Sequence, residues 1–182
     1  TKFFRKLNNF LFSLKSDDEN FNLLKLYLET TVFNYYFDED RTGLEDVLKL
    51  FEAIRAEKYE AYTSRYVTEE LERAQEPKKS KMLNLIEEYE IILLPFDEEA
   101  IRLSNLYIEN NIIPVSYRYD STHIAVASVY GLDCIVSYNF KHINRDKTKK
   151  LTTTINQEEG YEEIIICTAE EVLSKDEWEN IR

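Results

Sequence analysis

The sequence has 182 residues, of which 43% are hydrophobic and 13% aromatic, and its formal net charge is −12 at pH 7. This apolar content excludes a disordered chain, and no run approaches the roughly 20 apolar residues of a membrane-spanning helix. Because nucleic acids are polyanions, the net charge argues against a protein that binds them over its whole surface. We therefore expect a soluble, globular, cytoplasmic protein.

Residues 1–22 have the pattern of an amphipathic helix. Its apolar face would consist of Phe3, Leu7, Phe10, Leu11 and Leu14. Polar residues interrupt this stretch, so it lacks the continuous apolar core of a signal peptide. We expect a helical extension over residues 1–22, which packs on the domain or on a partner, and a single domain over residues 23–182.

Within the expected domain, short apolar strands alternate with helical patterns. The predicted strands are Leu26–Leu28, Tyr59–Thr63, Ile91–Leu94, Cys134–Ser137 and Glu163–Cys167, and the predicted helices are Gly43–Glu57, Ser64–Ala74, Pro77–Tyr89, Asp97–Asn110 and Asp120–Tyr130. This alternation predicts an α/β fold in which a central parallel sheet lies between layers of helices. Cys134 and Cys167 both fall in apolar strands, which favours two free buried thiols over a disulfide or a metal pair.

Several catalytic motifs are excluded by the rarity of glycine and histidine. With only Gly43, Gly131 and Gly160, the chain has no glycine-rich phosphate loop and no G-x-S-x-G turn. With only His123 and His142, it has no histidine-rich zinc site. The chemistry that remains is that of carboxylates.

Four polar side chains fall where a parallel sheet places its ligands. In such a sheet the crevice lies beyond the carboxyl ends of the strands. Glu29 ends the first predicted strand, Asn139 follows the "CIVS" strand, Asp120 begins a helix, and Glu70 lies in the "SRYVTEEL" helix. These residues are therefore candidates for one shared site.

The segments "LYLETTVF", "YTSRYVTEEL" and "DSTHIAVASVYGLDCIVSYNFKHI" resemble the PIN-domain family of metal-dependent ribonucleases, which includes the toxins of bacterial toxin-antitoxin pairs. The resemblance spans about residues 25–172. It implies a doubly wound three-layer α/β/α sandwich, an RNA substrate, and one or two Mg²⁺ or Mn²⁺ ions held by acids. An antitoxin protein and a second copy of the chain are the protein partners that we expect.

The resemblance also assigns roles by position. It implies a catalytic set of Glu29, Glu70, Asp120 and Asn139, with Glu29 and Asp120 as metal ligands and with Thr31 and Asp133 as auxiliary residues. Most relatives have Asp where this chain has Glu29, and many have Asp where it has Asn139. A missing carboxylate would weaken the binding of a second ion. The alternative function is a module that binds RNA or protein without cleavage.

A basic segment follows Asn139. Its cationic residues, Lys141, Arg145, Lys147, Lys149 and Lys150, are expected to bind the RNA backbone. A solvated surface loop is the competing interpretation.

Most of the candidates also have an ordinary structural interpretation. Glu29 could be a surface acid, Asp120 a helix N-cap, and Asp133 a turn residue. His123 and His142 are expected to be hydrogen-bonded structural histidines. Tyr138 and Phe140 are interpreted either as base-stacking residues or as core.

Overall fold

The computed structural model describes residues 23–95 and 97–174. The helical extension predicted for residues 1–22 lies outside these residues. Within the described part, no helix is long and apolar enough to cross a bilayer.

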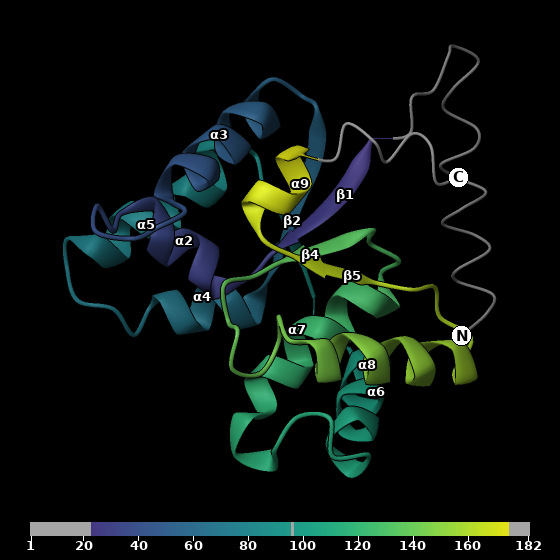
Figure 1. The fold of residues 1–182 in the computed structure, drawn as a ribbon. Helices are drawn as coiled ribbons and strands as arrows, with labels where there is room; N and C mark the ends of the chain where they lie inside the picture. The colour runs from purple at the N-terminus through teal and green to yellow at the C-terminus, as the bar shows by residue number, and fades with distance from the viewer. Residues whose placement is uncertain (1–22, 96, 175–182) are drawn as a thin grey trace.

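A five-stranded parallel sheet forms the centre of the molecule, as predicted (Figure 1). The strands are β1 (Leu24–Leu28), β2 (Tyr59–Ser64), β3 (Ile92–Leu94), β4 (Cys134–Val136) and β5 (Ile165–Cys167). They lie in the order β3-β2-β1-β4-β5. In this order β1 is central, and the chain winds outward from it in both directions.

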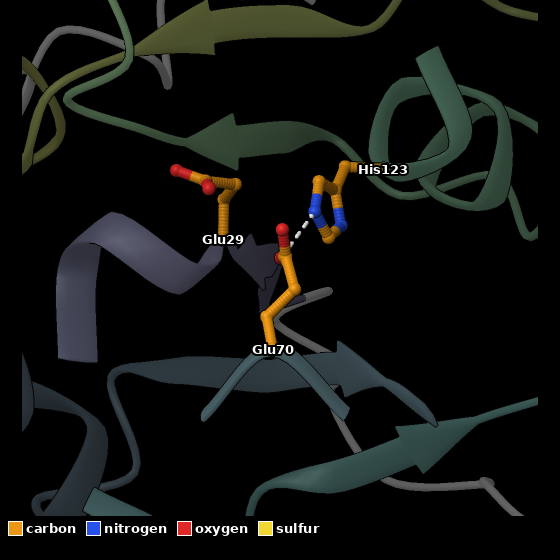
Figure 2. Close-up of side chains that lie close together, drawn as sticks. All are labelled: Glu29, Glu70 and His123. Atoms are coloured by element: carbon orange, nitrogen blue, oxygen red, sulfur yellow. Dashed lines mark hydrogen bonds and ion pairs between the residues drawn. The ribbon is translucent and has the colours of Figure 1, made fainter. Parts of the chain in front are cut away.

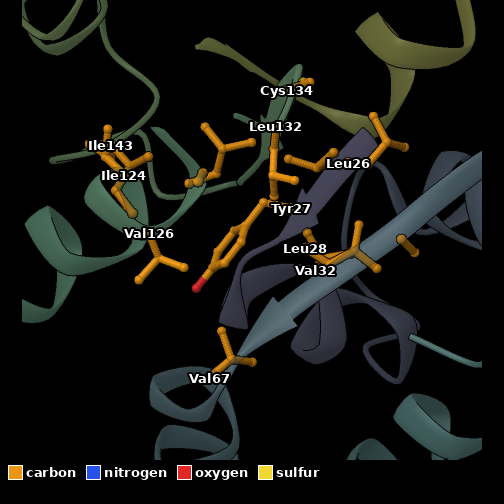
Figure 3. Close-up of a cluster of buried hydrophobic side chains, with 14 of the residues drawn as sticks. Leu26, Tyr27, Leu28, Val32, Val67, Ile124, Val126, Leu132, Cys134 and Ile143 are labelled. Carbon is orange, nitrogen blue, oxygen red and sulfur yellow. The ribbon is translucent and has the colours of Figure 1, made fainter. Parts of the chain in front are cut away.

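The core is built around β1. Leu26, Tyr27 and Leu28 are completely buried, as expected for a strand of a parallel sheet with helices on both faces. Figure 3 shows these residues among aliphatic side chains from several helices, with the Tyr27 hydroxyl pointing away from the strand. Because that hydroxyl is buried, it needs a hydrogen-bond partner inside the protein.

Helices cover both faces of the sheet. They are α2 (Thr30–Tyr36), α3 (Leu44–Arg55), α4 (Arg65–Leu71), α5 (Lys78–Glu88), α6 (Glu98–Glu109), α7 (Arg118–Val129), α8 (Asp146–Glu158) and α9 (Ala169–Ser174), with a 3-10 turn η1 (Val115–Tyr117) before α7. Figure 1 shows α3 and α9 on one side of the sheet and α6, α7 and α8 on the other. The three-layer α/β/α arrangement is thereby confirmed.

Three of these helices were not predicted. The most informative is α8, because its first residues belong to the basic segment, for which a surface loop was the competing interpretation. Its buried face carries Thr148, Thr152 and Asn156 instead of apolar residues, and threonine has a low helix propensity. Leu151 and Ile155 are its only apolar residues, so the apolar periodicity that marks a helix in the sequence is weak here.

The prediction of two free thiols is wrong, because Cys134 and Cys167 form a disulfide between β4 and β5. The strand register pairs Cys134 with Ile165 and Val136 with Cys167. The cysteines are thus diagonal neighbours on one face of adjacent strands. Their distance in sequence gave no sign of this register.

Candidate metal centre

The order of the strands places a topological switch point at the carboxyl ends of β1 and β4. These strands are neighbours, but the chain leaves β1 toward β2 and leaves β4 toward β5. Such a switch point is where open α/β sheets bind ligands. Glu29 follows β1 directly and donates its backbone N–H to the carbonyl of Val136 in β4, at 3.1 Å.

Glu29 is buried at this switch point, with only 3% of its surface exposed, so the interpretation as a surface acid is wrong. It is the N-cap of α2. Its Oε2 accepts hydrogen bonds from Thr31 N at 3.2 Å, Thr31 Oγ1 at 2.5 Å and Ser137 Oγ at 2.9 Å. Burial raises the pKa of Glu29 despite these donors and the nearby His123.

Glu70, on α4, reaches the same edge of the sheet as Glu29. Its Oε2 accepts from Thr30 Oγ1 and lies 2.9 Å from His123 Nε2. Burial opposes ionisation of this carboxyl, but the hydrogen bond and the charge of His123 outweigh it and hold the pKa of Glu70 below its usual value. The neighbouring Glu69 instead pairs with Arg65 at the surface, which agrees with the assignment of Glu70.

His123, on α7, is completely buried beside Glu70. Its Nδ1 lies 2.9 Å from Tyr27 Oη, and this hydroxyl lies 2.6 Å from Ser64 Oγ. Burial disfavours the imidazolium, but the hydrogen bond to Glu70 and the surrounding carboxylates raise the pKa of His123. The expectation of a hydrogen-bonded histidine therefore fits His123, although its partner is a candidate site residue.

Glu29, Glu70 and His123 form one compact cluster. One ligand atom from each lies within 4.8 Å of the others. Figure 2 shows the Glu70 carboxylate between Glu29 and the His123 ring. Every hydrogen bond that reaches the two carboxylates from the described residues ends on Oε2, which leaves both Oε1 atoms for a ligand.

Asp120 and Asn139 form a separate pair at the same edge. Asn139 Nδ2 donates to Asp120 Oδ1 at 3.1 Å, whereas Asp120 Oδ2 is buried and has no hydrogen-bond partner among the described residues. Burial raises the pKa of Asp120, and the charge of Glu70 adds to this effect. The N-cap interpretation is wrong, since α7 begins at Arg118 and its N-cap is Tyr117.

An orphaned carboxylate oxygen beside a cluster of acids is an arrangement that a cation completes. Burying a carboxylate oxygen without a partner is costly, and clustered acids repel one another unless a positive charge lies among them. A divalent ion with oxygen ligands therefore fits the donors present here.

The family model of the PIN domain matches residues 26–148. The chain belongs to the PIN-domain family. No curated protein sequence matches the chain. Its PIN fold is shared with the structure of VapBC2 from Rickettsia felis bound to a DNA fragment from their promoter, with a TM-score of 0.50, 12% identity, and coverage of 79% of this chain and 97% of that one.

Two further structures resemble this PIN domain more loosely. VapC20 of Mycobacterium tuberculosis, described as a Sarcin-Ricin loop cleaving toxin, is 13% identical over 64% of this chain and 92% of that one, with a TM-score of 0.45. DNA-bound VapBC from Salmonella typhimurium is 17% identical over 68% of this chain and 92% of that one, with a TM-score of 0.48.

Asp133 does not lie near Glu29 in this PIN domain. The Oδ2 atom of Asp133 accepts a hydrogen bond from the backbone N–H of Lys25 at 2.8 Å, so Asp133 lies at the amino end of β4. At about 3.3 Å per strand residue, this is roughly 13 Å from the end of β1 where Glu29 lies. The auxiliary role is therefore corrected to that of a turn residue. Thr31, in contrast, does lie at the switch point, where its hydroxyl bridges Glu29 and the backbone N–H of Tyr138.

Two cations of the basic segment form hydrogen bonds within the PIN domain. Arg145 Nη2 donates to the Ile112 carbonyl at 3.2 Å, and Lys147 Nζ donates to the Asn111 carbonyl at 3.0 Å. Lys141 is exposed, with its Nζ 3.1 Å from Tyr117 Oη; in α8, Lys149 is half-buried and Lys150 is exposed. In the described residues, Lys141, Lys149 and Lys150 are therefore the cations of this segment whose charged ends do not bond a backbone carbonyl.

The second histidine and the two aromatics have different surroundings. The His142 ring packs against Tyr117 at 3.8 Å between centroids, and neither of its ring nitrogens has a partner among the described residues. The expectation of a hydrogen-bonded structural histidine is therefore wrong for His142. Tyr138 stacks on Tyr35 at 4.0 Å, whereas Phe140 is 56% exposed, so only Phe140 offers a largely open ring.

Proposed function

We propose that this PIN domain is a divalent-metal-dependent ribonuclease with a catalytic set of Glu29, Glu70, Asp120 and Asn139. The observation that carries the proposal is the convergence of Glu29 and Glu70 at the switch point, each held through Oε2 with Oε1 free. The orphaned oxygen of Asp120 supports it independently.

Glu29 and Asp120 would hold an ion, either Mg²⁺ or Mn²⁺, together with Glu70. When bound, a divalent ion supplies a Lewis acid that lowers the pKa of water and stabilises charge on a phosphodiester. The protein's own contribution is positioning. Ser137 and Thr31 orient Glu29, Thr30 orients Glu70, and the Asn139 amide orients Asp120.

The RNA substrate would approach across the exposed residues that follow β4. Lys141 would neutralise a phosphate, and Phe140 offers an open ring for stacking on an unpaired base. We further propose that an antitoxin protein or a second copy of the chain binds the domain and that the protein acts in the cytoplasm. The disulfide is unusual for that compartment.

A PIN module that binds RNA or protein without cutting is the second candidate function. The observation that favours it is the amide of Asn139 beside Asp120. An amide can accept from a donor or bind a cation through oxygen, but it adds no negative charge to retain a second ion.

Cleavage of a labelled single-stranded RNA distinguishes these functions. We expect hydrolysis with Mg²⁺ or Mn²⁺ that stops with EDTA and is lost in Asp120→Asn. Glu109→Gln, which neutralises an exposed acid on α6, is the matched control and should cleave normally. RNA binding without hydrolysis under any of these conditions would establish the second candidate.

A further inference from the structure

We propose that His123 is itself a ligand of the divalent ion through Nε2, so that the site consists of carboxylates and one imidazole and favours Mn²⁺ over Mg²⁺. This inference rests on the proposed function only in requiring that a divalent ion binds at the switch point. It changes the expected chemistry of the site from all-oxygen to mixed nitrogen and oxygen.

The distances in the cluster suit a shared ion. Adjacent ligands of an octahedral ion, each about 2.1 Å from it, lie about 3 Å apart. His123 Nε2 lies 2.9 Å from Glu70 Oε2, so an ion that takes the place of the Nε2 proton would lie within reach of the Glu70 carboxylate. The whole cluster with Glu29 lies within 4.8 Å, slightly more than the roughly 4.2 Å between opposite ligands, so a small rotation of one carboxylate completes the set.

The other ring nitrogen has the partner that a metal-binding histidine requires. Such histidines use their second nitrogen for a hydrogen bond that fixes the tautomer and the ring orientation. In His123, Nδ1–H can donate to Tyr27 Oη, and the Tyr27 hydroxyl can donate to Ser64 Oγ. Nε2 therefore carries the proton that faces Glu70, and when an ion binds, this proton passes to solvent and the Nε2 lone pair points toward the carboxylates.

The elements that carry this chain of hydrogen bonds are well packed. Tyr27 is completely buried in the central strand, and Ser64 is completely buried at the end of β2. His123 lies on α7, in a run of buried residues from Ser121 to Ser128. The ring is therefore preorganised, and its position does not depend on a loop.

A nitrogen ligand changes which ion is preferred. Mg²⁺ is a hard ion that takes oxygen ligands and retains its waters. Mn²⁺ also suits carboxylate and water ligands, but it begins the transition-metal series whose members bind sites containing nitrogen, with affinities that rise from Mn²⁺ toward Cu²⁺. Removing His123 should consequently weaken Mn²⁺ binding more than Mg²⁺ binding.

Pulsed electron paramagnetic resonance on the Mn²⁺-loaded full chain, without a histidine tag, tests this directly. A directly bound imidazole gives Mn²⁺ a ¹⁴N coupling that changes when the histidines are labelled with ¹⁵N. Because the chain has only two histidines, His142→Gln is a matched control for His123→Gln. We expect the coupling in the wild type and in His142→Gln, and its loss in His123→Gln.

Titration calorimetry supplies the second readout. Glutamine at position 123 keeps an N–H near the place of Nε2 and so preserves a donor for Glu70. We expect His123→Gln to weaken Mn²⁺ binding by at least the about 10- to 100-fold that loss of a ligand's hydrogen-bond partner costs, with a smaller loss for Mg²⁺. Circular dichroism confirms that each variant is folded.

The outcomes separate this inference from the proposed function. Mn²⁺ bound without a nitrogen coupling, a coupling that disappears in His142→Gln, or equal losses for both ions would overturn the role of His123 and leave the metal site standing. If the folded wild type bound no divalent ion, both proposals would be wrong.

Discussion

The amide of Asn139 donates to Asp120 Oδ1 at 3.1 Å and leaves Oδ2 of the same carboxylate buried without a partner. The Asn139 amide thus stabilises the negative charge of Asp120, whereas a carboxylate at position 139 would repel that charge. We therefore expect the residue at position 139 to influence how many ions the proposed site binds.

Replacing Asn139 with Asp should destabilise the ion-free protein, because it brings a second negative charge against buried Asp120 and removes a donor. We expect the melting temperature without metal to fall by several degrees, which corresponds to about 1 kcal/mol. Mn²⁺ should restore more stability in the variant than in the wild type, since the added carboxylate supplies charge for a second ion. Calorimetry should then count additional bound Mn²⁺.

Asn139→Ala removes the hydrogen bond to Asp120 without adding a charge, so it separates the two effects of Asn139→Asp. It should destabilise the ion-free protein without gaining affinity for Mn²⁺. Equal affinity and stoichiometry in wild type and Asn139→Asp would place Asn139 outside the metal shell.

Glu29→Gln should stabilise the ion-free protein and abolish metal binding together. The glutamine oxygen can still accept hydrogen bonds from Thr31 and Ser137. The substitution removes a carboxyl group whose ionisation is opposed by burial, as its raised pKa shows. Differential scanning calorimetry with and without Mn²⁺ measures both effects. A destabilised variant that still binds Mn²⁺ would show that Glu29 is a structural cap of α2 and not a ligand.

The ion-free protein should lose stability as the pH rises from about 6 to 8. The raised pKa of His123 means that its pairing with Glu70 is fully present below the unfolded pKa of about 6.5 and is lost as the pH rises through the folded value. The raised pKa values of Glu29 and Asp120 act in the same direction, because folding favours their protonated forms and this contribution disappears as they ionise.

The melting temperature across this pH range, with EDTA and then with excess Mn²⁺, checks the sign. Mn²⁺ should flatten or reverse the trend because it replaces the lost protons. His123→Gln should remove part of the decline and His142→Gln should not, since burial lowers the pKa of His142. A melting temperature that rises with pH in EDTA would contradict the assignment.

Replacing Lys141, Lys149 and Lys150 together with Gln should weaken RNA binding and reduce its salt dependence. Each lost phosphate contact lowers the log-log slope by about 0.7 for a single strand. The matched control is Lys78, Lys79 and Lys81 to Gln, which removes the same charge from α5. Equal slopes for the two triple variants would mean that the basic segment is only a solvated surface.

The sheet could be predicted well from the sequence because buried parallel strands leave a clear signal. The strand at Leu26–Leu28 and the strand at Cys134–Ser137 are short apolar runs bounded by polar residues, and both lie within about two residues of the observed bounds. Glu29 was found for the same reason, since it is the first acid after such a run. In α8, by contrast, threonines and an asparagine form the buried face.

The internal arrangement of the site could not be predicted in the same way. Whether His123 faces Glu70 depends on how α7 packs against α4, and neither helix pattern encodes that contact. A weak signal was present, because His123 is one turn after Asp120, where residues i and i+3 share a face. Asp133 was assigned to the site because it is an acid next to β4. It precedes this strand, however, so it lies at the amino end of β4 and not at the carboxyl end where Glu29 and Asn139 lie.

Anomalous diffraction from crystals soaked in Mn²⁺ tests the metal site most directly. The account predicts an anomalous peak at the switch point, within about 2.2 Å of carboxylate oxygens of Glu29 and Glu70. It also predicts that Asp120 Oδ2 is satisfied either by the ion or by one of its waters. Soaked crystals with no peak between these residues, or with Mn²⁺ bound only at exposed acids elsewhere, would contradict the account.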